Sequence, residues 1–316
     1  MTRFEGNVVE THDLTKAFGA VKAVESLNLG ISAGEVFGFL GSNGAGKTTT
    51  IRLLLGLTAA DSGSALVLGL DPRVDARAIR KRCGVLLEYP GAYDRLTALE
   101  NLRFVGAAYG MSRDDIDSRG KQLLTEFELW DRRNDLVSTW SRGMRQKLGL
   151  VRAILHRPEL VFLDEPTAGL DPVATVSVRE MIGRITSDSG ATVFLTTHNL
   201  AEAERLCDRV AIIRAGRVLR VGKIADLDAS TARGTRRLRV SGDGFSESVI
   251  ANVKAVAGGN VIATDTELAV ELSSGSDPSS VVTAIVTAGG RVRSVKEEGS
   301  TLETIYLQLM EGERGK

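Results

Sequence analysis

The residues best suited to chemistry in this sequence form a glycine-rich segment that ends in a lysine and a hydroxyl side chain. The segment fits the pattern G-x-x-x-x-G-K-[ST] and consists of Gly41, Ser42, Asn43, Gly44, Ala45, Gly46, Lys47 and Thr48. Glycines let backbone N–H groups turn towards phosphate oxygens, and a helix start adds a favourable dipole. We expect Lys47 to bind the terminal phosphates of a nucleotide, Thr48 to hold Mg²⁺ and Thr49 to extend the phosphate-binding segment. The alternative is a surface lysine in a glycine-rich turn.

Two adjacent carboxylates follow a short apolar run, Leu160–Leu163. Unpaired carboxylates at the end of a buried strand are costly unless they serve a cation. We therefore expect Asp164 to bind Mg²⁺, directly or through water, and Glu165 to polarise an attacking water as general base. The alternative for Asp164 is that it caps a helix that begins near Pro166.

The elements that must position these residues are short apolar strands. Three such runs are Glu35–Leu40, Leu160–Leu163 and Ala191–Leu195, and each is followed by glycines or polar residues. Runs of this kind are typical of strands buried on both faces of a parallel sheet, and ligands of such sheets bind at the carboxyl edge. The sequence therefore predicts an α/β fold with its site at that edge.

The chain has three histidines, and one of them follows a predicted strand. A lone histidine is more often a structural hydrogen-bonding group, which is our interpretation of His12 and His156. His198 differs because it comes directly after the strand that ends in Thr196 and Thr197, beside the predicted site. We expect His198 to take part in the chemistry.

Two further regions depart from the sheet pattern. Helical periodicity dominates from about residue 89 to residue 157, which predicts an inserted helical subdomain. Small and charged residues at 229–237 predict a linker between domains 1–228 and 238–316. The last domain fits the order βαββαβ, typical of a ferredoxin-like unit, with a closing helix at Ser300–Met310. The predicted helices and strands of the βαββαβ unit are Leu238–Val240, Ser246–Val256, Asn260–Thr264, Leu268–Leu272, Ser279–Ala288 and Val292–Val295.

Composition excludes several classes of protein. The 316 residues suffice for two domains, and 40 basic residues balance 40 acidic ones, so no net charge favours a nucleic-acid partner. Neither a signal peptide nor a membrane-spanning run is expected. Cys83 and Cys207 lie far apart without metal-binding spacing, so we expect neither a disulfide nor a metal cage, and a cytoplasmic location.

The order and spacing of these motifs resemble the ABC ATPase family from about residue 8 to about residue 225. The segment Trp140–Met144 stands where that family has LSGGQ. Ser141 and Gly143 match the family, whereas Trp140, Arg142 and Met144 replace its leucine, first glycine and glutamine. Ser141 is a good helix cap, and a helix start binds anions. Taken alone, Ser141 could merely cap its helix.

The resemblance implies roles for several more residues. In ABC ATPases the LSGGQ helix start contacts the γ-phosphate held by a partner subunit, so that two domains enclose two ATP molecules head to tail. Asp171, in the segment Ala168–Asp171, resembles the D-loop that touches the opposite site, and His198 resembles the switch histidine. Phe18 falls where the family has an aromatic ring that stacks on adenine, although a phenylalanine is more often a core residue.

The clearest departure from the family is Glu88. It takes the place of the Q-loop glutamine, whose oxygen meets Mg²⁺ and whose loop faces the membrane subunit. A glutamate oxygen can also ligate Mg²⁺, but it adds negative charge near the γ-phosphate. The following residues fit either a groove for a helix of the membrane subunit or a loop with its own core contacts; they are Tyr89, Pro90, Tyr93, Leu96 and Thr97.

The resemblance predicts the ATP-binding and ATP-hydrolysing subunit of an ABC transporter. We expect a homodimer on the inner face of the cell membrane, held there by separate permease subunits. A single ATPase domain and a C-terminal extension resemble exporters of drugs, antibiotics or lipid-linked polymers, and the C-terminal domain is expected to tune or stabilise the dimer. The alternatives are a soluble ABC ATPase acting on DNA or the ribosome, and a regulatory subunit that binds ATP without hydrolysing it.

Overall fold

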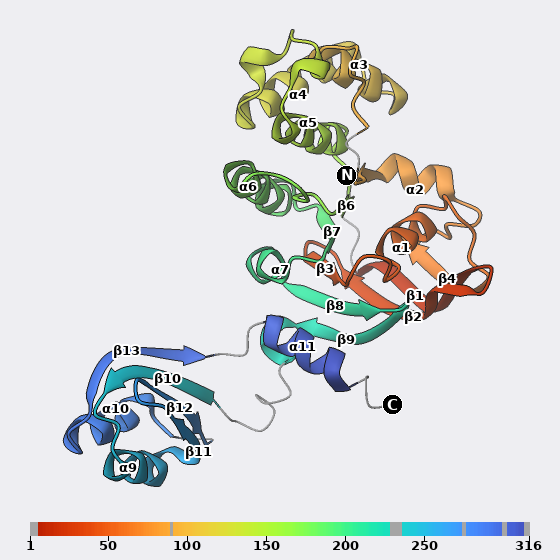
Figure 1. Cartoon of the computed structure of the whole chain (residues 1–316). Helices are drawn as coiled ribbons and strands as arrows, with labels where there is room; N and C mark the ends of the chain where they lie inside the picture. The colour runs from red at the N-terminus through yellow and green to blue at the C-terminus, as the bar shows by residue number, and fades with distance from the viewer. Residues whose placement is uncertain (1–5, 89–90, 228–235, 274–275, 299–301, 313–316) are drawn as a thin grey trace. The chain divides into compact units, whose positions relative to one another are not determined.

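The computed structural model describes residues 6–88, 91–227, 236–273, 276–298 and 302–312 (Figure 1). The chain divides into two compact units, Met1–Gly222 and Lys223–Lys316. The domain bounds drawn from the sequence, at 228 and 238, stay a prediction, and residues 228–235 of the expected linker lie outside the described residues. Among the helices of the described ranges, none has the length and apolar composition needed to cross a bilayer.

The first unit is built around a six-stranded sheet whose central strands are wholly buried. Hydrogen bonds join its strands in the order β5-β6-β7-β3-β8-β9, and the pairs β5·β6, β6·β7, β7·β3 and β3·β8 are parallel. Every residue of β3, β6 and β7 is buried, as expected for strands covered on both faces. The strands are β5 Cys83–Leu86, β6 Leu160–Asp164, β7 Thr192–Thr197, β3 Val36–Leu40, β8 Arg209–Arg214 and β9 Arg217–Lys223.

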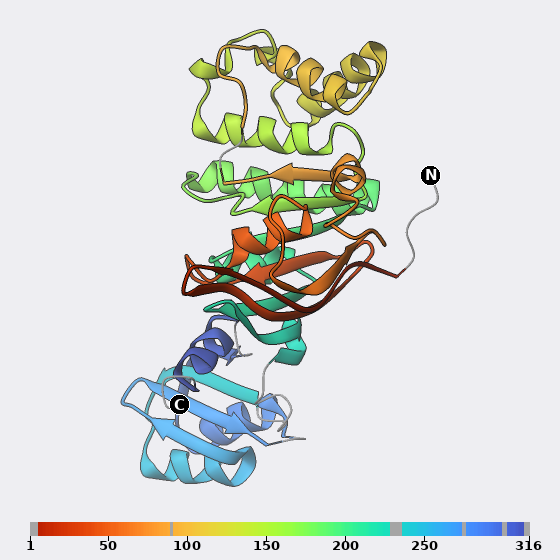
Figure 2. The same cartoon turned by 90° about the vertical axis from the view of Figure 1, so that its right-hand side faces the viewer.

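A second, antiparallel sheet packs against the same core. Its strand order is β2-β1-β4, with β1 Asn7–Phe18, β2 Val21–Ser32 and β4 Ser62–Val67. One apolar cluster joins this sheet to helix α1 (Lys47–Leu54) and to β3, so α1 is buried between the two sheets (Figure 2). This packing fixes the start of α1 at the carboxyl end of β3. Helix α2 (Ala76–Arg82) leads into β5.

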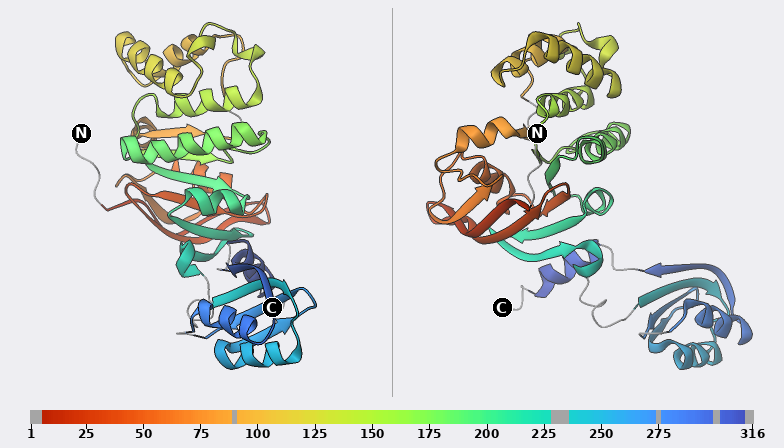
Figure 3. Two further views of the ribbon diagram at one scale, coloured as in Figure 1. Left: turned by 90° about the vertical axis from the view of Figure 1, so that its left-hand side faces the viewer. Right: turned by 180° about the vertical axis from the view of Figure 1, so that it is seen from behind.

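Helices form the remainder of this unit. Helices α3 (Ala98–Ala108), α4 (Arg113–Glu126) and α5 (Arg142–Ile154) gather at one end, and α5 lies beside α6 (Pro172–Ser189) (Figure 3). Two 3-10 turns, η1 (Trp130–Arg132) and η2 (Val137–Thr139), connect α4 to α5, and α7 (Leu200–Leu206) follows β7. Helix α4 ends at Glu126, because Glu128 adopts a left-handed φ of 59° and does not continue the helix.

His156 is a structural histidine at the end of α5. Its ring stacks on Tyr109 at 3.6 Å between centroids, and its Nε2 lies 3.1 Å from the carbonyl oxygen of Cys83. The carbonyl requires the proton on Nε2, and Nδ1 is buried without a hydrogen-bond partner among the described residues. Burial lowers the pKa of His156 from 6.5 to about 4.

This burial predicts a dependence of stability on pH. The unfolded chain protonates its histidine below its ordinary pKa of 6.5, whereas the folded chain does so only near its lowered pKa of about 4. The stability present at pH 7 is therefore lost progressively as the pH falls towards 4. Urea unfolding followed by Trp130 and Trp140 fluorescence should show wild type losing about 2 kcal/mol more than His156→Phe between pH 7 and pH 5. Equal losses would contradict the burial of a neutral imidazole.

The second unit holds a four-stranded sheet of order β11-β12-β10-β13, all of whose pairs are antiparallel. Helices α9 and α10 lie on one face of this sheet and share its apolar cluster. Arg236 and Arg237 belong to β10 and not to a linker, because they pair with β12. The first two residues of the expected closing helix, 300 and 301, lie outside the described residues. The second unit contains α8 Ile224–Leu227, β10 Arg236–Asp243, α9 Glu247–Ala257, β11 Gly258–Ala263, β12 Glu267–Leu272, α10 Pro278–Thr287, β13 Arg291–Glu298 and α11 Leu302–Gly312.

Candidate functional site

The glycine-rich segment forms the turn between β3 and α1. Gly46 has a φ of 108°, and a Cβ atom there would lie 2.1 Å from the carbonyl oxygen of Ala23. A Cβ on Gly41 would lie 2.5 Å from the carbonyl oxygen of Ile213. Only glycine fits at these two positions, and the first N–H groups of α1 open at the end of the turn because a helix start leaves them without intrahelical partners.

Lys47 lies at the centre of the site. Its Nζ donates to the carbonyl oxygens of Gly41 at 2.7 Å and Ser42 at 3.2 Å, and lies 3.1 Å from Oε1 of Glu165. The side chain is only 6% exposed. The ammonium is thus held at one point by the turn that it follows, and this is how a lysine acts as a fixed positive charge for phosphate.

Asp164 ends β6 and is almost completely buried. Its Oδ2 accepts from Oγ1 of Thr48 at 2.7 Å, and its Oδ1 accepts from Oγ1 of Thr196 at 2.5 Å. The alternative that Asp164 caps a helix near Pro166 is wrong, because α6 begins at Pro172 and its cap is Asp171. The carboxylate therefore joins α1, β6 and β7 at one edge of the sheet.

Glu165 and His198 meet at the same edge. The His198 Nδ1 lies 2.9 Å from Oε2 of Glu165. Glu165 has a φ of 51°, which is unusual for a residue with a side chain, and its N–H donates to the carbonyl oxygen of Thr196 at 3.0 Å. Such a conformation persists only where the surroundings hold it, and it is concentrated at functional sites.

One open cleft brings most of the predicted residues together. Glu88 is exposed and lines it, so the described lining contains three carboxylates and a single lysine. The lining residues are Ala23, Asn43, Gly44, Gly46, Lys47, Thr48, Thr49, Glu88, Asp164 and Glu165. Phe18 is not a core residue, because this residue is 53% exposed at the end of β1. Tyr89 and Pro90 lie outside the described residues.

The structure does not bring Ser141, Gly143 or Asp171 to the described lining of this cleft. Ser141 caps α5, where its Oγ accepts from the N–H of Met144 at 3.2 Å. Asp171 caps α6, and its Oδ1 accepts from the N–H of Ala174 at 2.9 Å. A Cβ on Gly143 would lie 2.8 Å from Cβ of Ala174, so the two helix starts pack closely. The second predicted anion site thus lies apart from the first.

Arg142 has a contact that the sequence does not predict. Its Nη2 donates to the carbonyl oxygen of Ala168 at 2.7 Å, and its guanidinium covers Gly169, where a Cβ would lie 2.3 Å from Nη1. The arginine that replaces the family's first glycine therefore links the start of α5 to the D-loop segment. Trp140, which replaces the leucine, is buried in the core.

Substitution of Arg142 tests the link between the start of α5 and the D-loop segment. Arg142→Ala is expected to lower the ATP turnover that the resemblance predicts about five-fold, equivalent to ~1 kcal/mol and to one ordinary intramolecular hydrogen bond, because the D-loop segment loses its support. ATP affinity should not change, since the phosphate turn is untouched. Phosphate release and ATP titration check both, with Arg73→Ala as the matched control because Arg73 pairs with Asp71 outside the described cleft. Unchanged turnover in Arg142→Ala would contradict the role.

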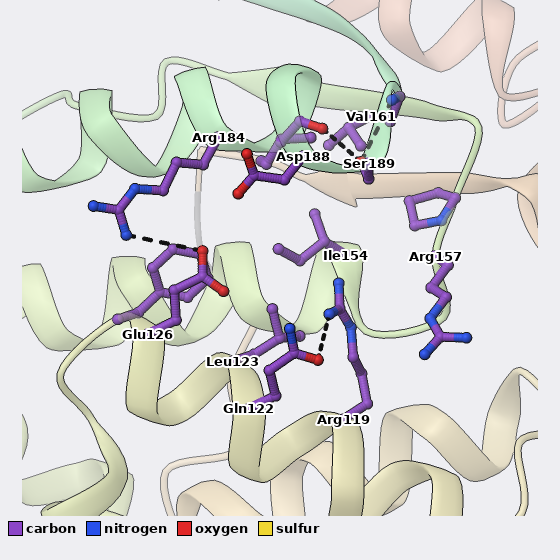
Figure 4. A pocket seen from close by; sticks show the side chains of 14 residues that line it. Arg119, Gln122, Leu123, Glu126, Ile154, Arg157, Val161, Arg184, Asp188 and Ser189 are labelled. Carbon is purple, nitrogen blue, oxygen red and sulfur yellow. Dashed lines mark hydrogen bonds and ion pairs between the residues drawn. The ribbon is translucent and has the colours of Figure 1, made fainter.

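A second cavity lies at the opposite end of the sheet. It is bounded by α4, α5 and α6, and Val161 lines it near the start of β6 (Figure 4). Arg119 donates to Gln122 at its wall, and Arg184 lies 3.9 Å from Glu126. None of the predicted site residues is among its described lining. The cleft that contains Lys47 lies at the other edge of the sheet, the carboxyl edge, as the strand pattern predicts.

Comparisons with known proteins agree with this geometry. Residues 24–168 match the family model described as ABC transporter. The chain is 36% identical over 304 residues to the daunorubicin/doxorubicin resistance ATP-binding protein DrrA of Streptomyces peucetius, covering 95% of this chain and 92% of that protein. It is 42% identical over 213 residues to the bacitracin transport ATP-binding protein BcrA of Bacillus licheniformis, covering 67% and 68%.

The solved structures include a similar ATP-binding subunit of an ABC transporter. It is 34% identical in sequence and superimposes with a TM-score of 0.65 over 71% of this chain and 93% of its own. The likeness in sequence extends through most of the chain, and the matched region contains the turn of Lys47 and the carboxylates that end β6. The chain belongs to the ABC transporter family as an ATP-binding subunit, and its activity is ATP hydrolysis.

Proposed function

We propose that the chain energises export through separate permease subunits, with ATP bound by Lys47 and hydrolysed by water that Glu165 activates. The observation that carries this proposal is the contact of Glu165 with both Lys47 and His198 at the carboxyl edge of the sheet. Glu165 then lies beside Lys47, the proposed phosphate-binding charge, and beside His198, the group proposed to orient the catalytic centre. Export is proposed because the similar proteins are named for drug resistance and bacitracin transport.

The cleft also fits Mg²⁺. Thr48 and Asp164 present a hydroxyl and a buried carboxylate, and Glu88 adds a further carboxylate, the oxygen ligands that Mg²⁺ prefers. The described residues contain no cage of three or more His, Cys, Asp or Glu, so phosphate oxygens would complete the site. We propose that these three residues hold the ion, which supplies positive charge to the phosphates when bound.

We further propose a head-to-tail dimer. Ser141 is exposed at the start of α5, and neither Ser141 nor Gly143 lines the described cleft of its own chain. Because the start of a helix binds anions, this second site would complete the nucleotide site of another copy. Asp171 lies at the neighbouring helix start and would face the same interface.

The permease is proposed to dock beside α3. Tyr93 and Phe104 form an exposed edge-to-face pair with ring centroids 4.8 Å apart, and they are 46% and 53% exposed. Interaction sites on protein surfaces are marked by contiguous exposed apolar groups, and this pair is one such contact. Thr97 is less available, because it caps α3 in a capping box with Glu100. Such docking would place the chain at the inner face of the membrane.

The second unit is proposed to be a ferredoxin-like accessory domain. From β10 to β13 its strands and helices follow the order βαββαβ, and its central strands are β12 and β10. We propose that it tunes or stabilises the dimer, since it contributes no described residue to the nucleotide cleft.

Crosslinking in native membranes tests the proposed function. Tyr93→Cys should crosslink to a protein with membrane-spanning helices, whereas Val74→Cys, at an 81% exposed position just before α2, should not. Identification of the crosslinked protein by mass spectrometry gives the answer. Equal crosslinking from both positions, or recovery of nucleic acid or ribosomal proteins with Tyr93→Cys, would contradict the proposal.

A further inference from the structure

Glu202 is a fully buried carboxylate outside the described lining of the nucleotide cleft. It lies in the first turn of α7, three residues after the cap Asn199. Within the described ranges, no lysine or arginine pairs with it. A buried charge without a cation persists only if hydrogen bonds satisfy its oxygens, so the donors that meet Glu202 explain its position.

Two hydroxyl groups satisfy this carboxylate. Oε1 accepts from Oγ1 of Thr167 at 2.6 Å, and Oε2 accepts from Oγ1 of Thr197 at 2.8 Å. Thr167 belongs to the loop after β6, and Thr197 is the last residue of β7. Glu202 therefore joins the loop after β6 to the end of β7, two segments from different strands of the sheet.

The start of α7 determines which donor each oxygen of Glu202 meets. In an ordinary capping box, the glutamate accepts directly from the N–H of the cap residue. Here the N–H of Asn199 donates to Oγ1 of Thr197 at 3.0 Å, and the Thr197 hydroxyl in turn donates a hydrogen bond to Glu202. Thr197 thus lies between the cap residue and Glu202. It occupies one carboxylate oxygen of Glu202 and leaves the other oxygen for Thr167.

The two joined loops carry the reacting pair. Thr167 follows Glu165 by two residues, and Thr197 directly precedes His198, whose Nδ1 lies 2.9 Å from Glu165. We propose that Glu202 is a positioning residue, whose carboxylate fixes the loop of Glu165 to the loop of His198. The inference rests on the proposed roles of Glu165 and His198.

The same loop is held at its neighbouring residues too. Gln146 Nε2 donates to the carbonyl oxygen of Pro166 at 2.7 Å, and Arg142 donates to that of Ala168. Residues 166, 167 and 168 are thus each bound by a side chain from α5 or α7. This anchoring follows directly after Glu165, whose left-handed backbone needs surroundings that hold it.

Full-length variants of Glu202 and Thr167 test the proposal. Glu202→Gln and Thr167→Val should each lower kcat about 10-fold to 100-fold, the range expected when a reacting group is misplaced by a fraction of an ångström to one ångström. The Kd for ATP should stay within about two-fold, because Lys47 and its turn are unchanged. Thr167→Ser keeps the hydroxyl and should retain wild-type turnover. The double variant should lose no more than the worse single variant, because both break one link.

Three results would overturn the proposal. They are unchanged kcat in both single variants, additive losses in the double variant, or a loss of kcat matched by equal losses in ATP affinity and thermal stability. If Glu202→Gln fails to fold, the comparison of kcat between Thr167→Val and Thr167→Ser still tests the proposal. Glu165→Gln, measured in parallel, separates the two claims, because turnover retained in that variant refutes the proposed role of Glu165 whatever Glu202 does.

Discussion

Glu165→Gln is expected to lower ATP turnover about 10³-fold, within the range of 10²- to 10⁴-fold that general bases contribute. Glutamine keeps the shape of the side chain, so its amide oxygen can still face Lys47 at the 3.1 Å position and the site keeps its geometry. What it loses is the capacity to accept a proton from water. ATP should therefore bind with near wild-type affinity and remain bound, and the variant should accumulate as an ATP-dependent dimer.

Phosphate release and size-exclusion chromatography with light scattering measure both parts of this expectation. Glu159→Gln is the matched control, because Glu159 pairs with Arg82 away from the described cleft. Turnover of Glu165→Gln within a few-fold of wild type would remove Glu165 from the reaction. Loss of ATP binding would show instead that its negative charge serves the fold of the phosphate turn.

Lys47→Ala should lower the affinity for ATP about 100-fold, equivalent to ~2.7 kcal/mol, the size expected for lost hydrogen bonds between an ammonium and phosphate oxygens. It should also lower the thermal stability of the free chain. Lys47 is the cation beside Glu165, whose side chain is 13% exposed, and its removal leaves a poorly solvated carboxylate without its ion-pair partner.

The double variant Lys47→Ala with Glu165→Gln separates these two effects. Removing both partners of a buried ion pair is less costly than removing one, so its thermal stability should recover while ATP binding stays lost. Lys254→Ala, an exposed lysine in α9, serves as the control. Calorimetric titration with ATP that gives wild-type affinity for Lys47→Ala would contradict the role of this lysine.

The phosphate turn and the acidic pair could be predicted from the sequence because their geometry is local. The turn needs glycine where a Cβ would meet Ala23 and Ile213, and this requirement is visible as a fixed spacing. The strands that precede the turn and the acidic pair are short and wholly apolar, so their carboxyl ends could be placed at one edge. The position of His198 at this edge of the sheet could be predicted in the same way. Its contact with Glu165 could not, because that contact depends on β6 and β7 being neighbours.

The contacts of Arg142 and Glu202 could not be predicted, because they depend on packing between distant segments. The spacing from Asn199 to Glu202 does predict a capping box, yet such a glutamate usually lies at the surface. Only the arrangement of α7 against the loop after β6 buries it and supplies Thr167. The predicted end of the linker, at 237, was wrong for a related reason. Arg236 and Arg237 have the charge expected of a linker in the sequence, but in the structure they pair with β12.

Steady-state phosphate release by the purified wild-type chain, measured across a range of protein concentrations, tests the account most directly. A nucleotide site completed by Ser141 of a second copy predicts that turnover per chain rises with protein concentration to a plateau, and that EDTA abolishes it. Turnover per chain that stays constant down to concentrations at which light scattering finds only monomers would contradict the composite site. No turnover at any concentration, with or without membranes, would contradict the assignment of Glu165 as the base.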